Sequence, residues 1–185
     1  MRRIIAAAAA ALMVSGSAAY GQSRVGPDSA TRLTRFGRDL AYGAAMGLGY
    51  AAVDQANNNP SEWGHGWNGY GKRAASNIGE FVIQEGVTEG LAAVMNRPLD
   101  YTPCTCRDFN GRVAWAIAGA VTDQMPNGSR PLAIPRIVGA YVGSFAQMSW
   151  WPSGTTNRTQ KALINGTTSL AFGAVINMYH EFRHH

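Results

Sequence analysis

The sequence predicts an all-α fold, a single-domain bundle of about five helices packed through glycine and other small-residue faces. The first observation behind this prediction is that apolar residues recur at three- and four-residue steps, which is the spacing of one helix face. The second is that glycines four residues apart recur in three of the helical segments. No strand-like alternation of apolar and polar residues competes strongly with this spacing.

Breaks at proline and glycine divide the helical pattern into five segments. We expect helices over residues 33–53, 72–96, 111–121, 136–151 and 156–183, the last of them interrupted near Gly166. Loops are expected over residues 61–71, 97–110 and 125–135. The helix over 72–96 is apolar on two sides, so we expect neighbouring helices or lipid around it.

The small-residue pairs predict how these helices meet. The pairs are Gly43 and Gly47, Gly86 and Gly90, Gly139 and Gly143, with Ser169 and Gly173 as a similar pair. Residues four apart lie on one helix face, so each pair would leave a groove in which another backbone can approach closely. Glycine costs about 1 kcal/mol relative to alanine inside a helix. Its repeated use therefore favours a packing role.

The first residues have the composition of a cleavable secretory signal. Arg2 and Arg3 give a positive start, residues 4–14 form an alanine-rich apolar run, and small residues follow. Cleavage is expected after Ala19 or Gly21. A membrane anchor is the alternative, but the apolar run is shorter than the roughly 20 residues that span a bilayer.

We therefore divide the chain into a signal peptide over 1–21, a polar linker over 22–31 and a helical domain over 32–185. The alanine-rich signal suggests a bacterial source, so the predicted location is the periplasm or the outer cell envelope. Two of the five net positive charges belong to the signal. The remaining excess is small and forms no run of Lys or Arg, so we expect no nucleic-acid partner.

The composition favours a tightly packed or membrane-contacting protein. The chain has 22 glycines, and only 15% of its residues are charged. The apolar stretches of the helical domain are interrupted by acidic residues and are too short for full spanning. Peripheral or partly embedded helices and a soluble bundle with an aromatic core both remain compatible with the sequence.

The only cysteines, Cys104 and Cys106, are separated by one residue. They can pair in an oxidising compartment, although so short a ring departs from relaxed disulfide geometry. We expect a structural or incidental role in preference to redox chemistry, and two thiolates alone do not make a zinc site. No cofactor is predicted.

The glycine-rich segment 61–71 holds the candidate ligand-binding residues Trp63, His65, Trp67 and Tyr70. The aromatic rings could stack on a sugar or hold an amphipathic ligand, with His65 as the polar contact. The alternative is that these rings cap the helical core.

Two acidic patterns suggest chemistry. His180, Glu181 and His184 spell H-E-x-x-H, the zinc-binding helix of metalloproteases, in which the glutamate is the base. Such sites need a further ligand and a rigid surrounding shell, so we favour a solvated helix end or adventitious metal binding. Glu85 and Glu89 share a helix face and could raise one another's pKa.

The alternative for these two carboxylates is structural. Buried acids are commonly neutralised by arginines, and the sequence offers Arg38, Arg112 and Arg136 for this purpose.

Three short segments carry a resemblance. With residues 62–64, 69–73 and 136–141 together, the chain resembles a group of small exported bacterial helical proteins of unknown function. The likeness covers most of residues 36–179. It implies an all-helical exported domain, it supplies no catalytic residues, and its pattern does not include the terminal histidines.

These observations lead to three functional hypotheses. The first is a non-enzymatic helical protein of the cell envelope whose partner is a membrane surface or an envelope protein, with oligomers formed through glycine faces. The second is a binder of a lipid or other amphipathic ligand between helices. The third is a zinc-dependent hydrolase that uses the C-terminal H-E-x-x-H.

Overall fold

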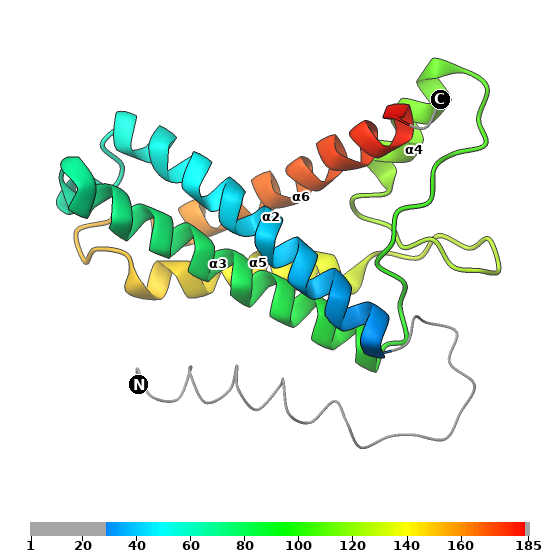
Figure 1. The fold of residues 1–185 in the computed structure, drawn as a ribbon, viewed down its shortest axis with the longest axis horizontal. Helices are drawn as coiled ribbons and strands as arrows, with labels where there is room; N and C mark the ends of the chain where they lie inside the picture. The colour runs from blue at the N-terminus through cyan, green and yellow to red at the C-terminus, as the bar shows by residue number, and fades with distance from the viewer. Residues whose placement is uncertain (1–28, 184–185) are drawn as a thin grey trace.

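The computed structural model describes residues 29–183 and contains five α-helices there (Figure 1). The helices are α2 (Ser29–Ala56), α3 (Gly66–Val94), α4 (Phe109–Ala118), α5 (Ile134–Trp150) and α6 (Arg158–Arg183), with a short 3-10 helix η2 (Ser61–Trp63). Within these residues there is no strand, only an isolated antiparallel bridge between Thr122 and Leu132. The all-α prediction is therefore confirmed. The predicted signal peptide, most of the predicted linker, and His184 and His185 lie outside the described residues.

The helices pack in series. α2 packs on α3, α3 on α5, α5 on α6, and α6 on α4. In Figure 1, α2 and α3 form a long hairpin, and α4 lies beside the C-terminal end of α6. α5 runs antiparallel to α3, because Ser144 hydrogen-bonds Glu80 whereas Gln147, further along α5, hydrogen-bonds Asn77. α3 is thus the central helix of the bundle.

Two predicted boundaries were wrong. The segment 61–71 was expected to be a loop, but α3 already begins at Gly66 and includes Trp67 and Tyr70. Gly69 does not break this helix, because it makes room for the preceding turn: a Cβ there would lie 2.9 Å from the Trp63 carbonyl oxygen. α6 is also continuous through Gly166, where a Cβ would lie 2.5 Å from the Tyr141 ring. Both glycines provide close approach.

A buried arginine fixes the connection between α2 and α3. Arg73 is 0% exposed, and its guanidinium donates to the carbonyl oxygens of Asn59, Gly64 and Pro60 at 2.8 Å each. It also donates to the side-chain oxygens of Gln55 and Asn58. A guanidinium has five N–H donors in a fixed fork, and here they bind the turn that reverses the chain. The hairpin is therefore closed by hydrogen bonds to one buried cation.

Small residues set the distances between the helices. A Cβ on Gly43 would overlap the Phe81 ring, and one on Gly47 would lie 2.9 Å from Ile78 Cγ1, so α2 approaches α3 at these glycines. On α5, a Cβ on Gly143 would lie 3.0 Å from the Glu80 carbonyl oxygen of α3. These pairs confirm the predicted close contacts.

The pair on α3 does not behave in this way. A Cβ on Gly86 or Gly90 would meet nothing within 4 Å, and the same holds for Gly173 on α6. The prediction that each small pair receives a neighbouring backbone was wrong here, because the packed face of α3 is formed by other residues.

That packed face is polar. Four side chains form the interior hydrogen-bond chain, which crosses the bundle from α2 through α3 and α5 to α6. Asn77 donates to Asp54 at 3.3 Å, Gln147 donates to Asn77 at 3.1 Å, and Asn165 donates to Gln147 at 3.0 Å. Gln147 is 1% exposed. Buried polar groups are costly unless they are paired, so this chain constrains how the four helices align.

We predict opposite effects for two glycine-to-alanine substitutions. Gly139→Ala would place a Cβ against Thr88 Oγ1 and 2.8 Å from the Gln84 carbonyl oxygen, so we expect the free energy of unfolding to fall by about 1–3 kcal/mol. Gly86→Ala meets nothing and should raise it by about 0.5–1 kcal/mol, because alanine favours helix. Urea denaturation measures both. Equal effects at the two positions would contradict the packing described here.

Candidate functional site

Large apolar side chains lie mainly on the outside of the bundle. The hydrophobic residues that are buried are mostly alanines, whereas many Leu, Ile, Val, Phe, Tyr and Trp side chains are exposed. Polar and charged side chains are buried instead, with Arg73, Asp123 and Glu181 each 0% exposed. This distribution is inverted relative to the usual soluble protein, in which charged residues are rarely buried.

Three helices carry the exposed side chains in ordered rows, which we call the outer stripes. The stripe of α2 consists of Tyr42, Met46 and Val53, that of α5 of Ile134, Val138, Val142 and Phe145, and that of α6 of Ile164, Val175 and Tyr179. Within each stripe the spacing is a sum of three- and four-residue steps, so its members share one helix face. On α2 this face lies about 100° around the helix axis from Gly43 and Gly47, the glycines that contact α3.

The sequence around these stripes is poor in charge. No Asp, Glu, Lys or Arg occurs over residues 40–53, 137–157 or 162–179. None of the described helices combines the length and the apolar character that crossing a membrane requires.

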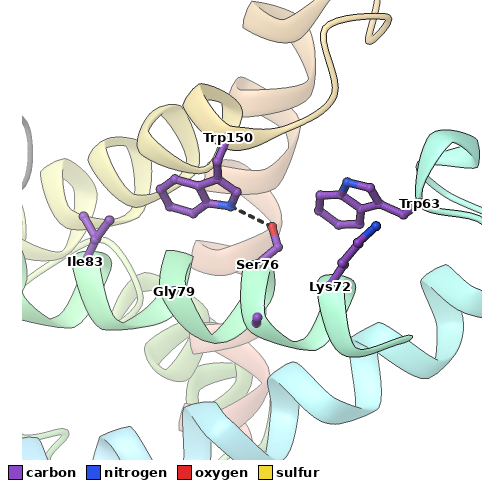
Figure 2. A pocket seen from close by; sticks show the side chains of 7 residues that line it. Trp63, Lys72, Ser76, Gly79, Ile83 and Trp150 are labelled. Carbon is purple, nitrogen blue, oxygen red and sulfur yellow. Dashed lines mark hydrogen bonds between the residues drawn. The ribbon is translucent and has the colours of Figure 1, made fainter. Parts of the chain in front are cut away.

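A separate groove lies beside α3, and we call it the tryptophan groove (Figure 2). It is lined by Trp63, Lys72, Ala75, Ser76, Gly79, Ile83 and Trp150. Trp63 comes from η2, Trp150 comes from the end of α5, and the other residues form one side of α3.

The four aromatic and histidine residues predicted to bind a ligand do not form one site. Trp63 lies in the tryptophan groove and packs edge-on against Trp151, with ring centroids 5.9 Å apart. Trp67 is 89% exposed and contacts the Tyr70 ring, whose hydroxyl donates to the Leu48 carbonyl oxygen. His65 is the exposed N-cap residue of α3.

Sequence reasoning did not identify Trp150 as the second tryptophan of the groove that Trp63 lines. Trp150 and Trp63 are far apart in the chain, and they line one groove because α5 runs antiparallel to α3. The available signal was the polar series Ser76, Glu80 and Gln84, whose four-residue spacing marks the face of α3 that meets α5 and α6.

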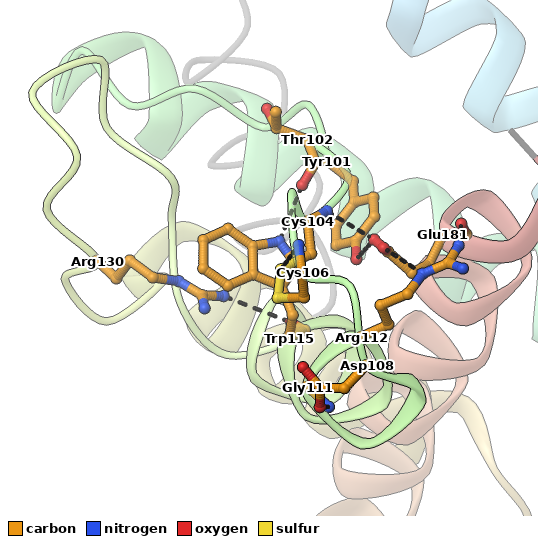
Figure 3. Close-up of a disulfide and its surroundings, with 10 residues drawn as sticks. All are labelled: Tyr101, Thr102, Cys104, Cys106, Asp108, Gly111, Arg112, Trp115, Arg130 and Glu181. Atoms are coloured by element: carbon orange, nitrogen blue, oxygen red, sulfur yellow. Dashed lines mark hydrogen bonds and ion pairs between the residues drawn. A yellow bond between two sulfur atoms is a disulfide. The ribbon is translucent and has the colours of Figure 1, made fainter. Parts of the chain in front are cut away.

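The glutamate of the H-E-x-x-H motif has a structural role in this arrangement (Figure 3). Its carboxylate accepts hydrogen bonds from the Tyr101 hydroxyl at 2.7 Å, the Cys104 amide at 2.9 Å and Arg112 Nε at 3.2 Å. Burial alone would raise the pKa of Glu181, but these hydrogen bonds hold it below its ordinary value. Both carboxylate oxygens already accept hydrogen bonds, which leaves the group poorly suited to act as a base.

The neighbouring residue points elsewhere. His180 is exposed, whereas Glu181 is fully buried, and His184 lies outside the described residues. Across residues 29–183 no three His, Cys, Asp or Glu side chains are grouped so that they could hold a metal ion. Cys104 and Cys106 form a disulfide, and through the Cys104 amide this short ring is attached to Glu181.

Charged side chains gather where α2 begins and α3 ends. Glu89 lies 3.5 Å from Arg32 and 3.6 Å from Arg35, and Arg35 also pairs with Asp100 at 2.6 Å. The arginines that neutralise Glu89 are therefore on α2. Of the three expected from the sequence, Arg38 pairs with Asp39 instead.

The other two expected arginines also have distinct roles. Arg112 pairs with Glu181 at the far end of the chain. Arg136 donates to the carbonyl oxygens of Gly119 at 2.7 Å and Leu99 at 2.8 Å, and its charge acts on Glu85. Arg136 therefore anchors two loops to the start of α5 and provides positive charge near Glu85.

Comparison with protein-family models, with curated proteins and with solved structures finds no match to this chain.

We predict that the stability of the protein depends on the protonation of Glu85. The pKa of Glu85 is raised to about 7, mainly by burial and also by the charges of Asp39 and Glu89, while Arg136 acts to lower it. The folded state thus holds a proton that the unfolded chain, with an ordinary pKa near 4.5, releases more easily. The stability gained from this proton is fully present below pH 4.5 and is lost as the pH rises through about 7.

Glu85→Gln should remove this dependence, because the amide does not titrate. Urea denaturation at about pH 5 and about pH 8 should show the largest stabilisation by the substitution at the higher pH. A constant difference between Glu85→Gln and the wild type across this range would contradict the assignment.

Proposed function

We propose that this protein is a non-enzymatic helical protein of the bacterial cell envelope, which attaches to a membrane surface through the outer stripes of α2, α5 and α6. The observation that carries the proposal is the inverted distribution of side chains, with a hydrogen-bonded polar interior and an apolar exterior. Helices in contact with lipid have this arrangement, since their polar residues face the bundle and small residues mediate close packing.

The spread of the stripes favours a membrane surface over a single protein partner. They lie on three helices, and α2 and α5 pack on α3 through separate sets of small residues. A lipid surface covers whichever stripes face it without needing a matching shape, whereas a protein partner needs a surface complementary to the stripes that it covers. Each half-exposed apolar side chain that leaves water contributes on the order of 1 kcal/mol.

The attachment would be interfacial. Helices lie in the interface when an apolar face enters the boundary of the acyl chains while the other face stays polar or packed. The predicted export supports an envelope location, and the buried, hydrogen-bonded Glu181 supports a structural role for the C-terminal motif.

We expect the exported protein to stay with native membranes after an alkaline carbonate wash and to float with phospholipid vesicles. Its mass should correspond to cleavage after Ala19 or Gly21, which excludes binding through an uncleaved leader. Val142→Glu places a charge in the α5 stripe and should reduce vesicle binding about tenfold, because burying an unpaired charge is costly.

Gln160→Glu is the matched control, since it adds the same charge at an exposed polar position of α6. It should bind vesicles as the wild type does, and circular dichroism should confirm that both variants fold. Full recovery of the wild type in the soluble fraction would overturn the proposal. A dimer that Val142→Glu dissociates, without vesicle binding by the wild type, would assign the stripes to a protein interface instead.

A further inference from the structure

The tryptophan groove has a shape that suits a single chain-like ligand. Its volume is about 580 Å³, within the range of pockets that hold one small molecule. The floor is one face of α3, where Ala75 and Gly79 are small, and Figure 2 shows Trp63 and Trp150 above this face. A Cβ on Gly79 would lie 3.7 Å from the Trp150 ring. The space above this position therefore depends on the absence of a side chain.

The tryptophan side of the groove is apolar, because the polar indole N–H of Trp150 is already hydrogen-bonded. Trp150 Nε1 donates to Ser76 Oγ at 3.0 Å, and the same oxygen accepts from Trp151 Nε1 at 3.2 Å. The polar edge of the Trp150 indole is thus already bonded to α3. Its carbon edge is left to contact a ligand, and Ile83 extends the apolar floor.

A positive charge lies at one end of the groove. Lys72 is exposed, and Figure 2 shows its side chain extending toward Trp63. The lining contains no acidic residue, and among residues 29–183 no carboxylate forms an ion pair with Lys72. The groove therefore combines an apolar path with one cation, which complements an anionic headgroup on an apolar tail.

The length of the groove along α3 indicates how long an apolar tail it can hold. Lys72 and Ile83 are eleven residues apart on α3, so they are separated by about 16 Å along the helix axis. Half the hydrocarbon thickness of a bilayer is about 15 Å, which is the depth reached by one acyl chain. One chain fits this path. The two chains of a phospholipid would need more space than the groove provides.

We propose that the tryptophan groove binds a long-chain fatty acid, with the carboxylate at Lys72 and the acyl chain over Gly79 between Trp150 and Ile83. The proposal does not rest on membrane attachment, because no residue of the groove belongs to an outer stripe.

Tryptophan fluorescence provides the test. The purified, delipidated protein is titrated with palmitate and with a brominated fatty acid of similar length, both below their micelle concentrations. We expect saturable binding of palmitate and quenching by the brominated acid. Gly79→Leu fills the floor of the groove and should abolish both signals. It should not unfold the protein, because leucine favours helix more than glycine does and a Cβ at this position makes only ordinary van der Waals contact with Trp150.

The headgroup is tested with Lys72→Gln. Loss of a charge-assisted hydrogen bond should weaken palmitate binding about tenfold, whereas binding of the uncharged fatty alcohol of the same length should stay unchanged. Arg107→Gln, which removes an exposed charge outside the groove, should leave both affinities unchanged. Equal binding by Gly79→Leu and the wild type, or no saturable quenching, would overturn the proposal. Unchanged palmitate affinity in Lys72→Gln would overturn the assigned headgroup position.

Discussion

A chain of hydrogen bonds across four helices determines how this bundle is aligned. Asp54, Asn77, Gln147 and Asn165 belong to four different helices, and each is placed so that its neighbour in the chain of hydrogen bonds is satisfied. Moving any of these helices by one residue would break a hydrogen bond of this chain, and a buried group such as Gln147 that loses its partner costs about 1–3 kcal/mol. The glycines of α2 and α5 bring the helices close enough for these short side chains to meet.

The polar interior determines where the large apolar side chains can lie. Alanine, glycine and hydrogen-bonding residues occupy much of the space between the helices, and many of the larger apolar residues extend outward. The outer stripes and the tryptophan groove are both products of this arrangement. They differ in shape, because a stripe is a convex helix face, whereas the groove is an open depression flanked by Trp63 and Trp150 over the small residues Ala75 and Gly79.

The sequence was sufficient for the fold class and for much of the helix packing. The helical spacing located all five helices, and the glycine pairs of α2 and α5 predicted close contacts at these positions without indicating that the partner is α3. The sequence did not predict the polar interior of the bundle. A glutamate such as Glu80 only interrupts an apolar pattern until its hydrogen-bond partner, Ser144, is known. The sequence was also insufficient for the groove, whose two tryptophans are brought together only by the crossing of α5 and α3. Such pairings depend on tertiary contacts, which local patterns do not encode.

The serial packing of the helices implies an uneven resistance to local opening. α3 is held between α2 and α5, whereas the close backbone contacts of α2 with other helices are to α3 alone, with one further ring contact between Tyr50 and Phe172 of α6. The amide protons of α2 should therefore exchange with solvent through a smaller fluctuation than those of α3, as expected for a separate cooperative unit at the edge of a fold. Because α2 also carries Tyr42, Met46 and Val53 on its free face, this edge helix has apolar surface to present. Opening of α2 would break the hydrogen bond from Asn77 to Asp54, whereas the hydrogen bonds that join α3, α5 and α6 would remain.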